Sequence, residues 1–201
     1  VIMSVGFASL PEIELSVKTL RRGHVRNLAI LQCTTSYSDT DRPDATNLRT
    51  MRDIADRFGV VVGFSDNMGG IEAPALAVAA GASIIEKHIV LRHDPAILDD
   101  RFSLDADAFT AMVQKIRVVE RMLGKVAYGP QTPQEAYNRR FRRSLFVSCD
   151  VKKGEKFTAR NVRSIRPADG LETKYYDKVI GKTAKKDIEA GTPLSWGLVQ
   201  K

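Results

Sequence analysis

The stretch VVVGFSDN, residues 60–67, indicates the fold of the first part of the chain. It opens with a short, β-branched apolar run without polar alternation, which is typical of a strand buried on both faces of a parallel sheet. The polar residues Ser65, Asp66 and Asn67 follow directly at the end of this run. We therefore expect a parallel strand whose carboxyl end carries side chains that can contact a ligand.

Three further segments repeat this pattern, so residues 1–125 contain four strand–helix units. The apolar runs are 1–4, 28–32, 60–64 and 84–88, and the helical stretches that follow them are 10–22, 46–58, 71–80 and 106–123. Ser9 before Pro11, and Asp105, are signals for the start of a helix. Gly59 and Gly81 stand where helices are expected to end. This alternation of strand and helix predicts an α/β fold.

Polar residues at the ends of all four strands decide between a small open sheet and half of a (β/α)8 barrel. They are Ser4, Gln32-Cys33-Thr34-Thr35, Ser65-Asp66-Asn67 and Glu86-Lys87-His88. Barrel active sites are built at the carboxyl ends of the strands, and four polar clusters in register favour the barrel. We predict that residues 1–125 form half of a TIM barrel with its site at this edge.

A linker and a second domain are expected after residue 125. The segment GKVAYGPQTPQEAYNRR, residues 124–140, contains two Gly and two Pro and no apolar periodicity, so we predict a linker over 126–140. Short β-like runs then lie at 144–149, 156–158, 164–166, 182–184 and 194–195. Residues 141–201 should form a small β-rich domain with a thin core, which suits docking on another surface.

The positive charge of the chain is concentrated in this second part. Residues 138–201 contain 16 Lys and Arg against 7 Asp and Glu, a net charge of +9, whereas residues 1–137 carry −2. The basic residues are scattered among acidic ones without an interleaved aromatic stripe, so we do not expect nucleic acid as a partner. A solvated face, an anionic small molecule or a partner surface explains the charge better.

Composition also bears on the cellular setting. No apolar run approaches the roughly 20 residues of a membrane helix, so no membrane partner is expected. The first residues show no basic segment before an apolar core, and Cys33 and Cys149 lie 116 positions apart. We therefore expect free thiols and a cytoplasmic protein.

The strand-end motifs SVGFAS, LQCTTSY, VGFSDN and IIEKH together resemble the second half of the sialic acid synthase barrel. The segment from FRRSLFV through NVRSIRP to GTPLSW resembles the SAF (antifreeze-like, β-clip) domain that follows it, most closely that of pseudaminic acid synthases. This family joins phosphoenolpyruvate to an N-acetylated amino sugar, releases phosphate and forms a nine-carbon sialic-acid-like sugar. The resemblance implies a transferase, a divalent Mn²⁺ or Mg²⁺ ion that polarises the sugar aldehyde, and a domain-swapped homodimer.

The resemblance also implies roles for single residues. Glu86 and Asp99 match acidic, catalytic positions, and His88 matches a metal ligand. The substrate-binding positions are Ser4, Thr35 and Ser65 on the phosphoenolpyruvate side, Tyr37 on the sugar side, and Arg166 of the SAF domain, which reaches the sugar N-acetyl group in the partner subunit.

Two features depart from the family pattern. The family motif is Ser-Asp-His, whose His is the second metal ligand, and this chain has Asn67 in its place. An amide oxygen is a weaker ligand than imidazole for Mn²⁺-class ions. The resemblance also starts at the fifth barrel unit, so the lysines that hold phosphoenolpyruvate in the family lie outside this sequence. The alternative is a degenerate, non-catalytic sugar-binding or oligomerisation module.

Several of these residues also have a purely structural explanation. Ser65 has the residue type that caps a helix, Asn67 suits the tight turn before the following glycines, and Asp99 suits a solvated loop. His88 alone is compatible with a buried, hydrogen-bonded histidine. Cys33 is expected to pack in the interior and not to act as a nucleophile, because no His lies nearby in the sequence.

Overall fold

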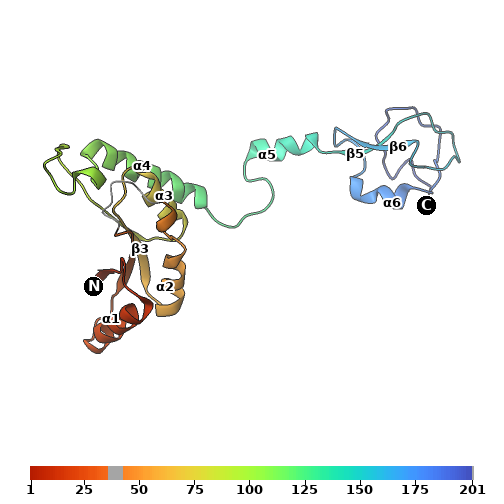
Figure 1. Cartoon of the computed structure of the whole chain (residues 1–201). Coiled ribbons are helices and arrows are strands. Elements are labelled where there is room, and N and C mark those ends of the chain that lie inside the picture. Colours follow the sequence, from red (N-terminus) through yellow and green to blue (C-terminus); the bar gives the residue numbers. More distant parts are fainter. Residues whose placement is uncertain (36–42, 201) are drawn as a thin grey trace. The chain divides into compact units, whose positions relative to one another are not determined.

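The computed structural model describes residues 1–35 and 43–200. The chain divides into two compact units, Val1–Lys125 and Val126–Lys201, which are drawn in Figure 1. Each unit contains a hydrophobic cluster of its own. In the described part of the chain, no helix combines the length and apolarity needed to cross a membrane.

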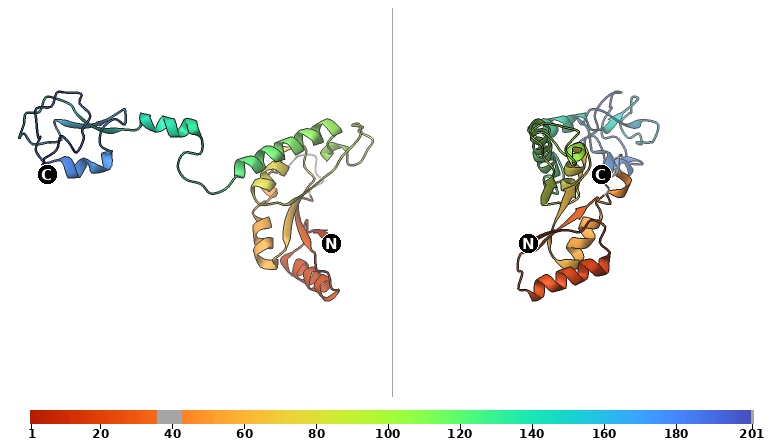
Figure 2. Two further views of the ribbon diagram at one scale, coloured as in Figure 1. Left: turned by 180° about the vertical axis from the view of Figure 1, so that it is seen from behind. Right: turned by 60° about the vertical axis from the view of Figure 1, so that its left-hand side comes forward.

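The first unit is built on a four-stranded parallel sheet whose strand order follows the chain. Its strands are β1 (Ile2–Ser4), β2 (Ala29–Cys33), β3 (Val61–Asp66) and β4 (Ile84–Lys87). The strands are followed by helices α1 (Leu10–Arg22), α2 (Thr50–Phe58), α3 (Glu72–Ala79) and α4 (Ala106–Leu123), shown from two further directions in Figure 2. This is the sequential strand–helix order of a barrel, so the predicted α/β half barrel is confirmed.

Helices α1 and α4 have the predicted bounds, and acidic side chains fix their first turns. The Glu12 carboxylate accepts hydrogen bonds from the Ser9 backbone N–H at 2.8 Å and from its hydroxyl at 2.6 Å. At the start of α4, Asp105 Oδ1 accepts from the Ala108 N–H at 2.8 Å. These bonds satisfy backbone donors that have no partner within the helix.

Helix α2 begins at Thr50 and not at Thr46 as predicted. A 3-10 turn over Pro43–Ala45 precedes it, and Asn47 has a left-handed backbone with φ of 49°. A residue in that region cannot continue a right-handed helix, so the helix starts only beyond it. Strand β3 is longer than predicted, because pairing with β4 continues to Asp66.

The two faces of the sheet have different roles. Four strand or strand-end residues, Val5, Ile30, Val62 and Phe64, belong to the core cluster that also contains residues of α1 and α2. Successive side chains of a strand point to opposite faces, so the intervening residues lie on the other face. The register aligns Cys33 with Ser65 and Ser65 with Glu86. These three residues therefore form a row on the face away from the helices.

The second unit contains a two-stranded antiparallel sheet of β5 (Ser144–Val147) and β6 (Val162–Ile165). Its helices are α5 (Pro133–Asn138) and α6 (Tyr176–Val179). The runs expected at 156–158, 182–184 and 194–195 are not regular strands, and chain pairing near them consists of isolated bridges. Glycines with positive φ at 154, 181 and 191 turn the chain there, which limits each run to a few residues.

The predicted linker contains helix α5, which the sequence analysis did not anticipate. Thr132 Oγ1 accepts a hydrogen bond from the Glu135 N–H at 3.1 Å, and Pro133 occupies the first turn. The glutamate side chain in turn accepts from the backbone N–H of Gln131. The order Thr-Pro-Gln-Glu is a capping signal, so this short helix was visible in the sequence.

Gly63 permits the close packing of β3 against its neighbours. A Cβ atom on it would lie 2.5 Å from the carbonyl oxygen of Ile84 and 2.5 Å from Leu31 Cδ2. We expect Gly63→Ala to lower the free energy of unfolding in urea by about 1–3 kcal/mol, the usual range for overpacking. Gly23→Ala is the matched control, because the nearest atom to a Cβ there would be the Leu20 carbonyl oxygen at 3.4 Å. Equal effects of the two substitutions would contradict this packing.

Candidate functional site

Two side chains on neighbouring strands form the centre of the candidate site. Ser65 Oγ donates a hydrogen bond of 2.7 Å to Glu86 Oε1, as expected for residues aligned in register. Ser65 is buried and Glu86 is exposed. A buried hydroxyl thus orients a carboxylate that faces solvent. A carboxylate in this setting can exchange a proton with a bound substrate.

Cys33 is the next residue in this row and is buried. Burial raises the pKa of its thiol, and the charges of Glu86 and Asp66 raise it further, against a lowering by hydrogen bonding to Ser65. A raised pKa leaves less thiolate at neutral pH, and the thiolate is the reactive form. Cys33 therefore serves as a packed neighbour of the Ser65–Glu86 pair and is a poor nucleophile.

Asn67 lies just beyond β3 and is buried. Its Nδ2 donates to the Thr34 carbonyl oxygen at 3.2 Å and lies 3.5 Å from Cys33 Sγ. These contacts occupy the amide nitrogen and leave the amide oxygen as the atom suited to coordinate a ligand. The Thr34 hydroxyl oxygen is buried and has no hydrogen-bond partner within residues 1–35 and 43–200.

His88 and Asp99 lie side by side. His88 Nδ1 is 3.8 Å from Asp99 Oδ2, and their side chains are 38% and 50% exposed. The imidazole also packs edge-on against the Phe102 ring, with a centroid distance of 5.1 Å. Among the described residues, no group of three or more His, Cys, Asp or Glu side chains is arranged to hold a metal ion. His88 and Asp99 by themselves therefore do not form a complete metal site.

A buried ion pair that the sequence analysis did not single out lies beside these residues. Lys87 Nζ is 2.9 Å from Asp66 Oδ2, and both side chains are 0% exposed. The ammonium group also donates to the Met68 carbonyl oxygen, and Asp66 Oδ1 accepts from the Met68 N–H at 3.0 Å. Together these contacts tie the end of β4 to the turn after β3. Opposite charges at the ends of adjacent predicted strands were the signal for this pair.

The remaining predicted residues lie at different places. Ser4 ends β1 and is exposed. Thr35 contacts the loop after β1, since a Cβ on Gly6 would be 2.9 Å from Thr35 Oγ1. Tyr37 is outside the described residues. Arg166 is exposed and belongs to the second unit, which the structure describes separately from the strand ends.

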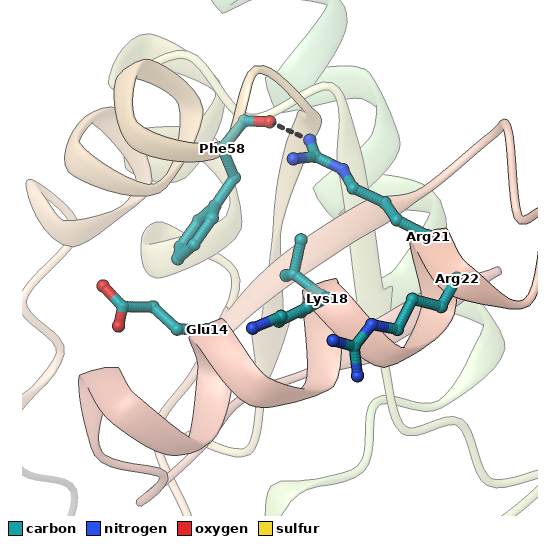
Figure 3. Close-up of a pocket in the computed structure, with 6 residues that line it drawn as sticks. Glu14, Lys18, Arg21, Arg22 and Phe58 are labelled. Carbon is teal, nitrogen blue, oxygen red and sulfur yellow. Dashed lines mark hydrogen bonds between the residues drawn. The ribbon is translucent and has the colours of Figure 1, made fainter.

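A groove of about 450 Å³ beside α1 and the end of α2 is a separate feature, shown in Figure 3. It is lined by Glu14, Lys18, Arg21, Arg22 and Phe58, together with one valine. Arg21 donates to the Phe58 carbonyl oxygen and so joins the two helices. None of the predicted site residues lines this groove, so it is distinct from the candidate site.

The comparison with known families agrees with this geometry. The model of the NeuB family matches residues 1–128, and that of the SAF domain matches residues 142–200. The chain therefore belongs to the NeuB family and carries a SAF domain. This confirms the resemblance inferred from the strand-end motifs.

Individual relatives are sugar acid synthases. The chain is 39% identical to the pseudaminic acid synthase of Campylobacter jejuni over 98% of its own length and 56% of that protein. It is 32% identical to the N,N'-diacetyllegionaminic acid synthase of the same species, over 94% of this chain and 57% of that protein. The crystal structure of N-acetylneuraminic acid synthetase from Leptospira borgpetersenii matches with a TM-score of 0.59 and 32% identity, covering 69% of this chain and 48% of that one. The chain thus spans slightly more than half the length of the pseudaminic acid synthase and of the legionaminic acid synthase.

Replacing Lys87 tests the buried ion pair. We expect Lys87→Met to lower the free energy of unfolding by about 3–5 kcal/mol, because Asp66 would keep a buried charge without its cation. Arg52→Met is the matched control, since Arg52 pairs with Asp56 at 2.7 Å but the two side chains are 78% and 59% exposed. That control should cost less than about 1 kcal/mol. Similar losses for both variants in urea titrations would show that the Lys87 pair is not buried.

Proposed function

We propose that this chain contributes the second barrel half and the SAF domain of a synthase that condenses phosphoenolpyruvate with an N-acetylated amino sugar. The product is a nine-carbon sialic-acid-like sugar, and phosphate is released. The observation that carries this proposal is the Ser65–Glu86 hydrogen bond of 2.7 Å at the strand ends of a NeuB-family barrel. A degenerate, non-catalytic module is not favoured, because the relatives compared are named synthases.

The reaction needs proton transfer at a carbonyl oxygen. A carbon–carbon bond forms between the methylene carbon of phosphoenolpyruvate and the aldehyde carbon of the sugar, whose oxygen takes up a proton. Water adds to carbon 2 of phosphoenolpyruvate, which the new bond leaves electron-poor, and the bond from this carbon to the phosphate oxygen then breaks to give the ketone. The two protons of this water balance those taken up by the sugar oxygen and by the departing phosphate. Glu86 is the proposed acid–base group, because its carboxylate is exposed and oriented by the buried hydroxyl of Ser65. Asp99 is the second proposed acidic group.

Hydroxyl and cationic groups account for substrate binding in this proposal. Ser4, Thr35 and Ser65 are the proposed hydroxyl residues on the phosphoenolpyruvate side. Ser4 and Thr35 supply donors there, whereas the single O–H of Ser65 would have to turn from Glu86 to donate to the substrate. Tyr37 and Arg166 contact the sugar, and Arg166 does so from the SAF domain of the partner subunit in a domain-swapped homodimer. A guanidinium group suits this role because it stays charged and can fork onto a carbonyl or carboxylate acceptor.

The identities to the relatives support a proposal for the kind of sugar. The proposed sugar is of the pseudaminic type, since identity is 39% to the pseudaminic acid synthase and 32% to the legionaminic acid synthase. The proposed setting is the reducing cytoplasm, in which Cys33 and Cys149 would stay as thiols.

A divalent ion, Mn²⁺ or Mg²⁺, is the proposed cofactor. His88 would hold it with its imidazole, and Asn67 with the amide oxygen that its contacts to Thr34 and Cys33 leave available. Nitrogen and oxygen donors suit these ions, although imidazole at both positions would bind Mn²⁺ more strongly. When bound, the ion supplies Lewis-acid polarisation of the sugar aldehyde.

The catalytic proposal is tested in a barrel-complete protein that contains this chain. We expect phosphate release from phosphoenolpyruvate to require an N-acetylated amino sugar. Glu86→Gln should lower kcat by about 10²–10⁴-fold, as for loss of a general acid or base. Glu120→Gln, an exposed change on α4, is the control and should leave kcat unchanged. Unchanged turnover in Glu86→Gln would refute the role of this carboxylate.

The metal proposal is tested by titrating the same protein with Mn²⁺ and following the free ion by electron paramagnetic resonance. Asn67→His should tighten binding by about tenfold, because imidazole is the stronger ligand for this ion. His88→Ala should abolish saturable binding. Asn27→His, an exposed substitution of the same chemistry, should change nothing. Equal affinities of the parent and Asn67→His would show that residue 67 does not contact the ion.

A further inference from the structure

A basic pocket in the second unit is not explained by the function proposed above. It has a volume of about 620 Å³ and lies next to the start of β5. The side chains relevant here are Arg139, Arg142, Arg143, Glu172, Thr173 and Lys174. Arg166, the residue expected to contact the sugar, does not line it. The pocket therefore lies next to the segment that carries the predicted sugar contact, but that side chain does not form its wall.

The cations of the pocket outnumber its single lining carboxylate. Three arginines and one lysine line the pocket together with Glu172, which pairs with Lys174 at 2.7 Å. The pKa of Glu172 is lowered, first by this lysine through its hydrogen bond and its charge, and also by Arg142 and Arg139. The two arginines thus lie within electrostatic range of the same carboxylate. One carboxylate leaves most of the positive charge of the pocket uncompensated.

Two of the guanidinium groups are available to a ligand. In the described part of the chain, the side chains of Arg139 and Arg142 have no hydrogen-bonded acceptor. Arg143 differs, because its Nη1 donates to the Ser164 carbonyl oxygen at 2.7 Å. Arg140 also differs, since its guanidinium stacks on aromatic rings, 4.1 Å from the centroid of Tyr137. Of these four arginines, Arg139 and Arg142 thus combine free donors with a place in the pocket lining.

Hydrogen bonds and a close backbone contact hold the wall beside these groups. Ser144 Oγ donates to the Pro167 carbonyl oxygen at 2.7 Å and accepts from the Gly170 N–H at 2.9 Å. A Cβ on Gly170 would lie 2.2 Å from the Leu145 carbonyl oxygen, so this position accommodates glycine alone without a backbone shift. These contacts join the turn after β6 to the first residue of β5, which directly follows Arg142 and Arg143 in the chain.

We propose that this pocket binds the phosphate or carboxylate group of a small anionic molecule. Guanidinium groups present paired N–H donors whose geometry matches the oxygens of both groups. The Thr173 hydroxyl and the Lys174 ammonium, both on the pocket wall, supply further donors. Bound anion would also relieve the repulsion among the clustered cations, which the single Glu172 offsets only in part.

The test is a titration of the full chain at low ionic strength, followed by amide signals in ¹H–¹⁵N NMR spectra, with inorganic phosphate in one arm and malonate in the other. We expect saturable shifts at Arg142, Gly170 and Thr173. The tighter-binding probe assigns the group as phosphate or carboxylate. Arg142→Gln should weaken binding about tenfold, the effect of losing a charge-assisted hydrogen bond, and Arg139→Gln with Arg142→Gln should abolish saturation.

The matched control removes two positive charges elsewhere in the same unit. Arg160→Gln with Arg163→Gln changes exposed residues that do not line the pocket, and should alter affinity less than twofold. If both double variants weaken anion binding equally, the proposal is wrong, because the affinity would then depend on the total positive charge of the unit and not on this pocket. Absence of saturable shifts with either anion would overturn it as well. Because all four arginines are exposed, native spectra of the variants without ligand serve as the check on folding.

Discussion

The buried contact between Lys87 and Asp66 is the interaction on which the candidate site depends. Moving two charges out of water is costly, and such a pair is tolerated only when further hydrogen bonds satisfy it. Here the backbone of Met68 supplies them, because its carbonyl oxygen accepts from the lysine and its N–H donates to the aspartate. The end of β4, the end of β3 and the following turn are thus held in a single arrangement.

The geometry of the site follows from this arrangement. Neighbouring residues of a strand point to opposite faces, so an ion pair of Asp66 and Lys87 on the helix side leaves Ser65 and Glu86 on the other face. Along β3 and β4, residues that stabilise the fold therefore alternate with residues that can contact a substrate. Asn67 continues from the fixed turn and reaches back to β2 through its amide nitrogen. The strand register and the ion pair together determine which side chains a substrate would meet.

The sequence was most informative where local patterns decide the structure. Apolar runs and helix caps predicted the four strand–helix units, and polar strand ends predicted the edge where Ser65 and Glu86 meet. The Lys87–Asp66 pair was missed because charges at strand ends resemble solvated residues until the register is known. Helix α2 started late because of the left-handed backbone of Asn47, a conformation that Asn adopts more readily than most other residues. The second unit was predicted least well, because its chain pairs through isolated bridges between glycine turns.

The Lys87 ammonium group is shielded from water between β3 and the turn that follows it. NMR of the chain with ¹⁵N-labelled lysine measures how fast the protons of each lysine ammonium group exchange with water. A buried, hydrogen-bonded Lys87 should give a persistent ammonium signal at neutral pH with a nuclear Overhauser contact to Met68. Lys152, whose side chain is 77% exposed, is the internal reference for fast exchange. Exchange of Lys87 as fast as that of Lys152 would contradict the account.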